Sequence, residues 1–179
     1  ARHVHLPLQS GSDAVLKRMF RKYRTRHYAS RLEIARRLMP DAAIGADVMT
    51  GFPGETEAEF EETARFIEAQ PFTYLHVFTY SERPGTRAAD QGTSVPMAVR
   101  RERTRRLREL SDRKNLEFRR GMIARRLAAV TLEQRGMALT SNFLKIEMSG
   151  ARAPNQLVDL EIGSVTEVGL RELRLLPMI

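Results

Sequence analysis

Hydrophobic and polar residues along the first part of the chain follow two periods, which predict strands separated by helices. Three segments have the composition and alternation of β-strands, at residues 2–8, 42–50 and 72–80. Between them, apolar residues recur every three or four positions, which is the period of an amphipathic helix. These strands start 30 to 40 residues apart with helices between them, which is typical of βαβ units and predicts a parallel sheet.

The clearest local signal is the segment 42–63. A strand-like run ends at a turn with two glycines, 51–54, and Thr56 then precedes Glu59 by three residues, the spacing of a capping box. The glutamates around this position place negative charge at the positive end of the helix dipole. A strand, a tight turn and a capped helix in this order predict a ligand site at the carboxyl end of a parallel strand.

Two other helices have recognisable ends. Thr25 is predicted to cap a helix that stops at Pro40, and a long basic helix is expected over Pro96–Arg119. The predicted architecture is therefore an α/β fold with a partial (β/α) barrel, because three strands are too few to close a barrel. Its open edge is a surface through which the chain could associate with itself.

Near Arg120-Gly121 the pattern changes to short alternating runs that are separated by turn residues. This pattern predicts a small antiparallel β-barrel or sandwich. The sequence thus predicts two domains, an α/β domain over 1–120 and a small β-barrel over 121–179. The expected strands lie within 127–134, 143–148, 156–163, 164–170 and 173–177, with turns at Gly136, Ser149-Gly150, Pro154-Asn155 and Gly163.

The composition excludes several classes of protein. The chain has no cysteine, and therefore no disulfide and no thiolate metal site of its own. It contains no apolar run as long as a membrane span and opens with no signal peptide, so we expect a cytoplasmic protein without a membrane partner. Because the chain opens at Ala1 directly on a strand, we expect it to be a piece of a longer protein.

The net charge of +8 is concentrated in one band. Between Arg100 and Arg126 there are twelve Lys or Arg and four Asp or Glu, which alone give +8. Such a band favours a polyanionic partner. The alternative is a solvated helix whose arginines pair with acidic residues one turn away, at Glu102, Glu109, Asp112 and Glu117.

Four motifs together resemble the second half of the radical-SAM methylthiotransferases, over about Val4 to Ala89. They read HLPLQSGSD, VLKRMFRKY, GADVMTGFPGETEAEFEET and LHVFTYSERPGTRAA. Enzymes of this family insert a methylthio group into tRNA adenosine or into an aspartate of a ribosomal protein. The tail, through LTSNFLKIEM, is similar to the TRAM domain, a small RNA-binding β-barrel. Within the family, the segment LHVFTYS resembles the branch that acts on threonylcarbamoyladenosine next to the anticodon.

The resemblance implies that the chain binds S-adenosylmethionine. By position in the motifs, the residues implied are Gln9, Ser10, Arg21, Asp47 and Ser81. An amide suits the ribose or the carboxylate, a guanidinium can bind the methionine carboxylate bidentately, and a strand carboxylate can hold ribose hydroxyls. The resemblance implies contact between adenine and the backbone of Ser81.

Each of these residues has a structural alternative. Gln9 and Ser10 can cap the helix that starts near Asp13, and Arg21 can be one more surface arginine. Asp47 lies among apolar residues, where a carboxylate needs a partner. His5 and His76 are expected to face the core or the barrel lumen, as satisfied core histidines rather than as ligands.

The resemblance also implies tRNA as a partner and two 4Fe-4S clusters in the full-length protein. Such clusters are held by cysteine thiolates, so their ligands are expected outside this chain, and the isolated chain is expected to be inactive. The residues expected to contact RNA are Arg101, Arg105, Arg108, Asn142, Phe143 and Lys145.

Three alternatives to this function stay open at the level of sequence. Two are other branches of the family, which modify isopentenyladenosine in tRNA or an aspartate of a ribosomal protein. The third belongs to another class, a non-catalytic RNA-binding module made of the basic helix and the β-barrel. That module would explain the charge band and a salt-dependent association. It leaves Gln9, Arg21, Asp47 and the glycine turn without a purpose.

Overall fold

The computed structural model describes residues 1–88 and 93–174, which divide into two compact units. One unit comprises Val4–Lys114, and the other comprises Ala1–His3 together with the chain from Asn115 onward. The division falls inside the long helix α4 (Met97–Arg120), a few residues before its end. The expected domain boundary at Arg120-Gly121 coincides with the end of this helix.

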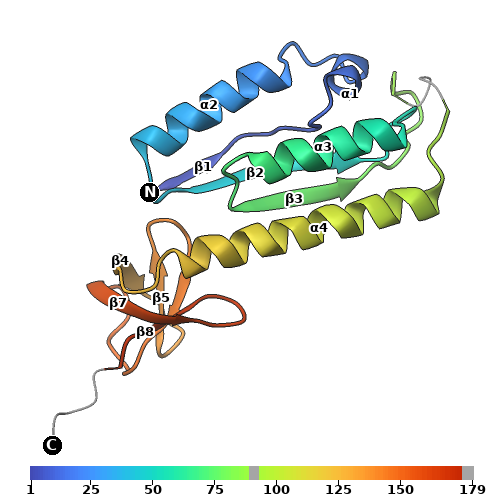
Figure 1. Ribbon diagram of the computed structural model, residues 1–179. Helices are drawn as coiled ribbons and strands as arrows, with labels where there is room; N and C mark the ends of the chain where they lie inside the picture. Colours follow the sequence, from blue (N-terminus) through green and yellow to red (C-terminus); the bar gives the residue numbers. More distant parts are fainter. Residues whose placement is uncertain (89–92, 175–179) are drawn as a thin grey trace, which may run out of the picture. The chain divides into compact units, whose positions relative to one another are not determined.

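The first unit is built on a three-stranded sheet in the order β1-β2-β3 (Figure 1). The strands are β1 (His3–His5), β2 (Ala43–Thr50) and β3 (Tyr74–Thr79). β2 and β3 are parallel, and a parallel bridge between Gln9 and Val48 extends the pairing of the first segment beyond β1. The predicted parallel sheet of three strands is therefore confirmed.

Three helices accompany the two crossovers (Figure 1). They are α1 (Asp13–Arg18), α2 (Thr25–Leu38) and α3 (Glu57–Ala69). The apolar faces of the second and third form one core with the sheet, and the first contributes Val15 to a smaller cluster with Phe52 and Tyr80. The fully buried side chains that join sheet and helices include Leu8, Leu32, Ile44, Phe60 and Ile67.

The ends of these helices test the predicted caps. The capping box of α3 is present, with Thr56 accepting from the Glu59 N–H and the Glu59 side chain accepting from the Thr56 N–H. The prediction for Thr25 is wrong, because Arg24 holds the N-cap position and the Thr25 N–H is instead bound by the Asp13 carboxylate at 2.8 Å. At α1 the N-cap is Ser12, without a side-chain cap, so neither Gln9 nor Ser10 caps this helix.

Helix α4 covers the edge of β3 (Figure 1). The Leu75 N–H donates to Ser111 Oγ at 2.8 Å, and Arg108 donates to the Val77 carbonyl at 3.3 Å. Thr104 Oγ1 lies 2.7 Å from Thr79 Oγ1. The first two bonds satisfy backbone groups that an open strand edge would expose, so this edge is protected by the chain itself. Self-association through an open edge stays a prediction.

The second unit is a closed barrel of five strands, in the order β4-β5-β6-β8-β7. The prediction that it is wholly antiparallel is wrong, because β6 and β8 pair in parallel. All other neighbours are antiparallel. Five strands form a ring with an odd number of members, in which directions cannot alternate all the way round, so one pair must be parallel. The bounds are β4 (Arg126–Thr131), β5 (Met137–Thr140), β6 (Lys145–Glu147), β7 (Leu157–Val165) and β8 (Leu170–Glu172).

The predicted strands of this unit need three corrections. β5 was not predicted, since its four residues are too few to show alternation. The run 164–170 is not one strand, because Thr166 and Gly169 form a hydrogen-bonded turn between β7 and β8. Gly163 is no turn but lies at a bulge inside β7, where a Cβ would come within 2.9 Å of the Leu173 backbone. Of the run 173–177, the last three residues lie outside the described part of the chain.

In the part of the chain that the structure describes, no helix has both the length and the apolar character that crossing a bilayer requires.

Candidate functional site

A cavity of about 150 Å³ lies at the carboxyl end of the sheet. Gln9 and Arg21, which lie twelve positions apart in the sequence, both contribute to its wall. The other lining residues come from α1 and the residues after it, from β2 and its turn, and from the segment after β3: Arg18, Met19, Phe20, Met49, Phe52, Arg87 and Ala88. The cavity thus combines an apolar floor with an amide and three guanidinium groups.

Gln9 is held in the cavity wall by its backbone. Its N–H donates to the Asp47 carbonyl at 2.8 Å, and its own carbonyl accepts from the Met49 N–H at 2.9 Å. Its φ of 70° lies in the left-handed region, which is costly for a residue with a side chain. Strain of this kind persists where the surrounding structure enforces it, and it often marks a ligand site.

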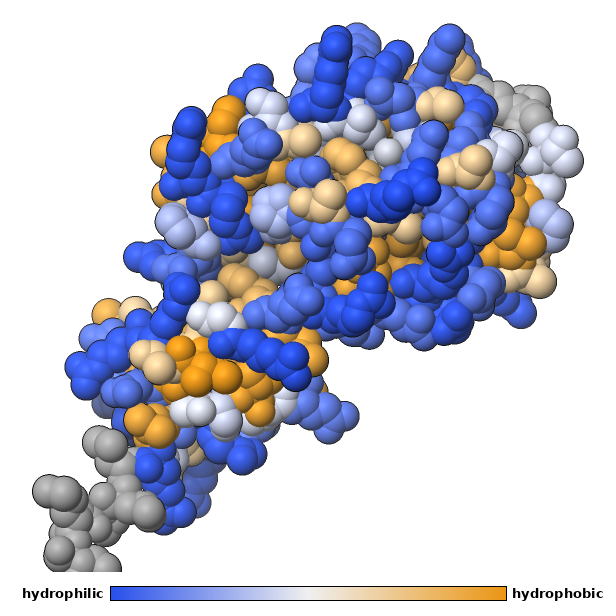
Figure 2. All heavy atoms as spheres, viewed as in Figure 1, coloured by the Kyte–Doolittle hydropathy of each residue, from blue (hydrophilic) through white to orange (hydrophobic). Residues whose placement is uncertain are grey.

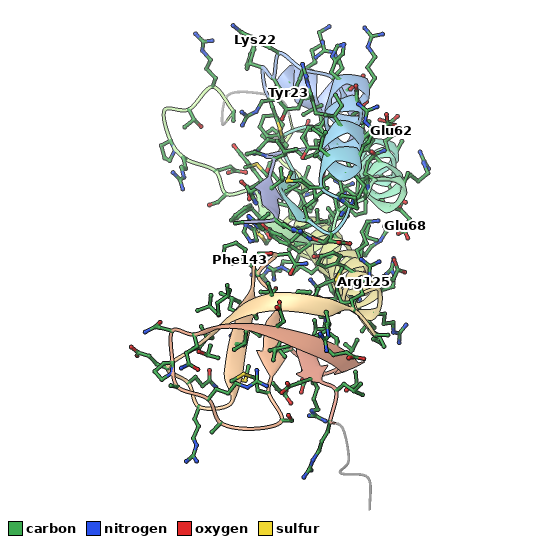
Figure 3. The ribbon with its side chains drawn as sticks, turned by 90° about the vertical axis from the view of Figure 1, so that its left-hand side faces the viewer. Lys22, Tyr23, Glu62, Glu68, Arg125 and Phe143 are labelled. Atoms are coloured by element: carbon green, nitrogen blue, oxygen red, sulfur yellow. The ribbon has the colours of Figure 1, made fainter. Side chains whose placement is uncertain are left out.

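The loop after α1 positions Arg21. The Arg21 N–H donates to the Leu16 carbonyl at 2.9 Å, and Phe20 before it has a φ of 55°. Tyr23, labelled in Figure 3, ties this loop to the end of the first strand segment by donating its hydroxyl to the Leu8 carbonyl at 2.8 Å. Among the described residues, no carboxylate pairs with the Arg21 guanidinium, so it is available to an anionic ligand.

Arg18 also lines the cavity, although it was not among the residues predicted from the sequence. Two of its nitrogens bind the Glu59 carboxylate bidentately, at 2.8 and 2.6 Å. Its Nε is buried and has no hydrogen-bond partner among the residues that the structure describes. An unpaired buried donor in the wall of a cavity is expected to bind a ligand acceptor there. The only sequence signal for Arg18 is that it precedes Arg21 by three residues. Such pairs of basic residues are common in this chain, so the spacing alone does not identify a site.

The other expected cofactor residues do not line this cavity. Ser10 is fully buried, and its hydroxyl lies 3.0 Å from Thr63 Oγ1. Ser81 is exposed in the segment after β3. Asp47 precedes Met49 by two residues on β2, so both side chains lie on the same face of the strand. The Asp47 carboxylate does not reach the cavity and contacts two histidines.

These histidines are His5 and His76. Asp47 Oδ1 lies 3.0 Å from His5 Nε2 and 3.3 Å from His76 Nδ1. Of the two expected environments, the core is wrong for His76, whose side chain is 55% exposed, while that of His5 is 29% exposed. The sheet face away from the helices, where His76 lies, is the side that faces the lumen in a (β/α) barrel. Side chains alternate along a strand, so Val77 and Leu75 face the helices and His76 takes the opposite face of the sheet.

The basic helix α4 is largely neutralised by acidic residues. Arg105 lies between Glu102 and Glu109 on its own helix, which raises the pKa of its guanidinium. Other arginines pair with α3 and the residues before it, at Arg103–Glu55, Arg103–Glu57, Arg106–Glu57, Arg106–Glu61 and Arg113–Glu68. The expected RNA-binding residues of this helix, Arg101, Arg105 and Arg108, are all exposed, but Arg105 is held in its two ion pairs and Arg108 also donates to the Val77 carbonyl.

The barrel unit presents the other expected RNA-binding residues differently. Asn142 is buried, and Thr140 donates to its side-chain oxygen. Phe143, on the loop between β5 and β6 (Figure 3), is 57% exposed with a φ of 62°. Lys145 is also exposed. Phe143 borders an apolar hollow of about 320 Å³ on this unit. Figure 2 shows that apolar residues reach the surface of the unit.

Comparison with known proteins agrees with this arrangement. Residues 1–67 match the family model described as the radical SAM superfamily. A tRNA-2-methylthio-N(6)-dimethylallyladenosine synthase of Mycobacterium marinum is 40% identical over 174 residues, which cover 89% of this chain and 33% of that protein. The threonylcarbamoyladenosine tRNA methylthiotransferase MtaB of Bacillus subtilis is 49% identical over 116 residues, which cover 65% of this chain and 26% of that protein.

Residues 1–67 are thus similar to radical-SAM proteins, and the parallel sheet with a cavity at its carboxyl end agrees with that class. Over most of its length the chain is similar to part of the tRNA methylthiotransferases. The chain spans about a third of the length of the relatives that it matches.

Proposed function

We propose that this chain is part of a tRNA methylthiotransferase, in which the sheet unit forms part of the wall that binds S-adenosylmethionine. The observation that carries the proposal is the convergence of Gln9, Arg18 and Arg21 on one cavity at the carboxyl end of the strands. In open parallel sheets, ligands bind outside this end of the strands. The names of the relatives support the same class of reaction.

The chemistry of the cavity fits one part of the cofactor. Arg21 binds the methionine carboxylate, Arg18 Nε adds a donor, and the Gln9 amide binds the ribose or the carboxylate. Ligand pockets usually enclose about 300 to 1,000 Å³, so this smaller cavity holds only a portion of the molecule. Ser10, Asp47 and Ser81 stay predictions. Asp47 would have to leave its two histidines in order to bind a ribose.

The residues of this chain do not fit the iron–sulfur cluster that the family implies. Such a cluster is held by cysteine thiolates, and the chain has no cysteine. We therefore assign to the chain only binding and positioning. We expect the isolated chain to bind S-adenosylmethionine weakly and to release no deoxyadenosine from it under reducing conditions.

For the substrate we propose N6-threonylcarbamoyladenosine in tRNA. The relative with the higher identity, from Bacillus subtilis, is named for this nucleoside, and the Leu75-His76 pair before Val77-Phe78 favours the same branch. The competing substrate is dimethylallyladenosine, because two relatives named for it each match 89% of the chain, whereas the Bacillus subtilis relative matches 65%. The proposed partner is tRNA, bound by the barrel unit and by exposed arginines of α4, in the cytoplasm.

Calorimetric titration of the chain with S-adenosylmethionine tests the cofactor site. We expect Arg21→Ala and Gln9→Ala each to weaken binding by about three- to tenfold, the effect of one lost hydrogen-bonding group. Arg26→Ala on α2, which lies outside the cavity lining, serves as the matched control. Equal affinities of all three variants and the unchanged chain would remove the cavity from the proposal.

A chimera tests the substrate. The matching part of this chain replaces the corresponding quarter of the Bacillus subtilis relative, and the chimera is expressed in cells that lack their own methylthiotransferases. Mass spectrometry of tRNA nucleosides is expected to detect the 2-methylthio form of threonylcarbamoyladenosine. Detection of only the dimethylallyl product would favour the competing substrate. Methylthiolation of a ribosomal protein alone would exclude tRNA.

A further inference from the structure

Three side chains from three neighbouring strands converge on the sheet face opposite the helices. His5 comes from β1, Asp47 from β2 and His76 from β3, and the register pairs Asp47 directly with His76. One donor atom from each lies within 4.8 Å of the donor atoms of the other two. Each strand contributes one ligand atom, so the rigid sheet fixes their spacing.

The distances from Asp47 to the two histidines have the lengths expected around a metal ion. Zinc binds imidazole nitrogen and carboxylate oxygen at about 2.0–2.2 Å, so two ligands at angles between octahedral and tetrahedral lie roughly 2.9–3.4 Å apart. Asp47 Oδ1 is 3.0 Å from His5 Nε2 and 3.3 Å from His76 Nδ1. The His76 imidazole is 55% exposed, so it can rotate to bring its Nδ1 nearer to His5.

A fourth residue fixes the outer side of His5. The Tyr74 hydroxyl lies 3.2 Å from His5 Nδ1, the nitrogen that faces away from Asp47. Histidines that bind metals generally hydrogen-bond through their second nitrogen, and this bond sets the tautomer and the ring orientation. Gly45 makes room for Tyr74, because a Cβ at that position would lie 2.0 Å from its ring. Gly45 therefore leaves the space in which the Tyr74 ring lies beside the histidine.

We propose that His5, Asp47 and His76 form a binding site for one divalent transition-metal ion, with Zn²⁺ or Fe²⁺ as the fitting class. Two imidazoles and one carboxylate leave positions open for water or an anionic oxygen, as in facial-triad sites. All three side chains are between 28% and 55% exposed, so an ion can enter from solvent. The proposal is independent of the S-adenosylmethionine cavity, which none of these residues lines.

The competing interpretation is a hydrogen-bond network without an ion. In that network both imidazoles donate to Asp47 Oδ1 and the Tyr74 hydroxyl donates to His5 Nδ1. The two interpretations make opposite predictions about added metal. The chain is well suited to the experiment because it has no cysteine and only four histidines, so few other groups compete for the ion.

The experiment titrates the chain, without a polyhistidine tag, with Co²⁺ and follows the visible absorption of the bound ion. We expect a one-to-one complex that Zn²⁺ displaces. We expect His76→Ala and Asp47→Asn each to weaken it by more than about tenfold, since loss of an outer-shell partner alone costs 10- to 100-fold. His27→Ala on the exposed surface of α2 is the matched control and should leave binding unchanged.

Circular dichroism of each variant shows whether it folds. If Asp47→Asn does not fold, the Co²⁺ affinity of His76→Ala, a change at an exposed position, still tests the proposal. In a second measurement, ¹⁵N NMR of the imidazoles on addition of Zn²⁺ should shift His5 Nε2 and His76 Nδ1 and not the ring nitrogens of His27. The absence of a one-to-one complex at millimolar Co²⁺, or binding that His76→Ala leaves unchanged, overturns the proposal in favour of the network. Binding of S-adenosylmethionine is measured separately, with the Gln9 and Arg21 variants. The proposal of a metal site and the proposal of a cofactor site can therefore fail independently.

Discussion

The guanidinium of Arg103 on α4 lies 2.9 Å from the carboxylate of Glu55, in the turn that follows β2. Both side chains are almost completely buried, at 5% and 1% exposure. The same Glu55 oxygen accepts from the Gly51 N–H at 2.7 Å, and Arg103 also donates to the Glu55 carbonyl. The ion pair therefore fastens α4 to the turn at the carboxyl end of the sheet, next to the residues that line the cavity.

Removal of Arg103 should destabilise the sheet unit strongly. Arg103→Met leaves the Glu55 charge buried without its partner, and breaking a buried pair in this way costs about 3–5 kcal/mol. Urea unfolding at pH 7, followed by circular dichroism, measures the loss. Arg101→Met, at an exposed position of the same helix, is the control and should change stability by less than about 0.5 kcal/mol. A loss below about 1 kcal/mol for Arg103→Met would show that Glu55 relaxes to solvent.

The strain at Gln9 predicts that stability and ligand binding can be separated. Gln9→Gly relieves a φ of 70° and is expected to raise the free energy of unfolding by up to about 1 kcal/mol. The same change removes the amide, so affinity for S-adenosylmethionine should fall by about three- to tenfold. Gln9→Ala loses the amide and keeps the strain, and should therefore weaken binding without a gain in stability. Denaturation and calorimetry on both variants check this; a destabilised Gln9→Gly would refute it.

Local signals in the sequence predicted the elements that depend on neighbouring residues. The capping box of Thr56 and Glu59 and the strand near 43–50 are confirmed, because each depends on spacing within one segment. The prediction of the N-cap of α2 failed because that helix start depends on a residue outside its own segment. The local sequence favours Thr25 over Arg24 as the N-cap, but the bond that orders this helix start comes from Asp13, twelve residues earlier.

The candidate site was predicted only as far as the family motifs extend. Gln9 and Arg21 do meet in one cavity. The role of Arg18 depends on Glu59, which is 41 residues away, and the pairing of α4 with α3 joins residues 45 to 49 positions apart. Charge counting along one helix cannot find such pairs. The sequence also placed His5, Asp47 and His76 on three strands without indicating their common face as a cluster.

The ion pair between Arg18 and Glu59 predicts a specific acid dependence. The hydrogen bond from Arg18 lowers the pKa of Glu59 below its ordinary value of 4.5 in the folded protein. A carboxyl group with a lowered folded pKa contributes stability above its unfolded pKa, and this contribution is lost as pH falls through the folded pKa.

Arg18→Gln should therefore reduce stability near pH 7 and reduce it less below pH 4.5, where protonation weakens the pair in the unchanged chain too. Solvent reaches both side chains, so the difference is expected to be about 1 kcal/mol or less. Urea unfolding of both proteins between pH 7 and pH 3 measures it. A difference that stays constant across this range would assign the effect of Arg18 to packing instead of charge.

Binding of tRNA should depend on salt through the unpaired basic residues and not through the whole charge band. Each phosphate neutralised by a protein cation contributes about 0.9 to the slope of log affinity against log salt for a duplex. Arg101→Ala and Lys145→Ala, at exposed positions, are expected to lower this slope by about one each. Arg105→Ala is the matched control on α4. Because Glu102 and Glu109 already bind Arg105, its loss should change the slope little.

Phe143→Ala should weaken binding by about 1–3 kcal/mol without changing the slope, since an exposed ring contributes by stacking on a base. Filter binding between low and physiological salt measures all four variants. An affinity insensitive to salt, or a slope that Arg105→Ala lowers as much as Arg101→Ala, would show that this surface does not bind tRNA in the proposed way.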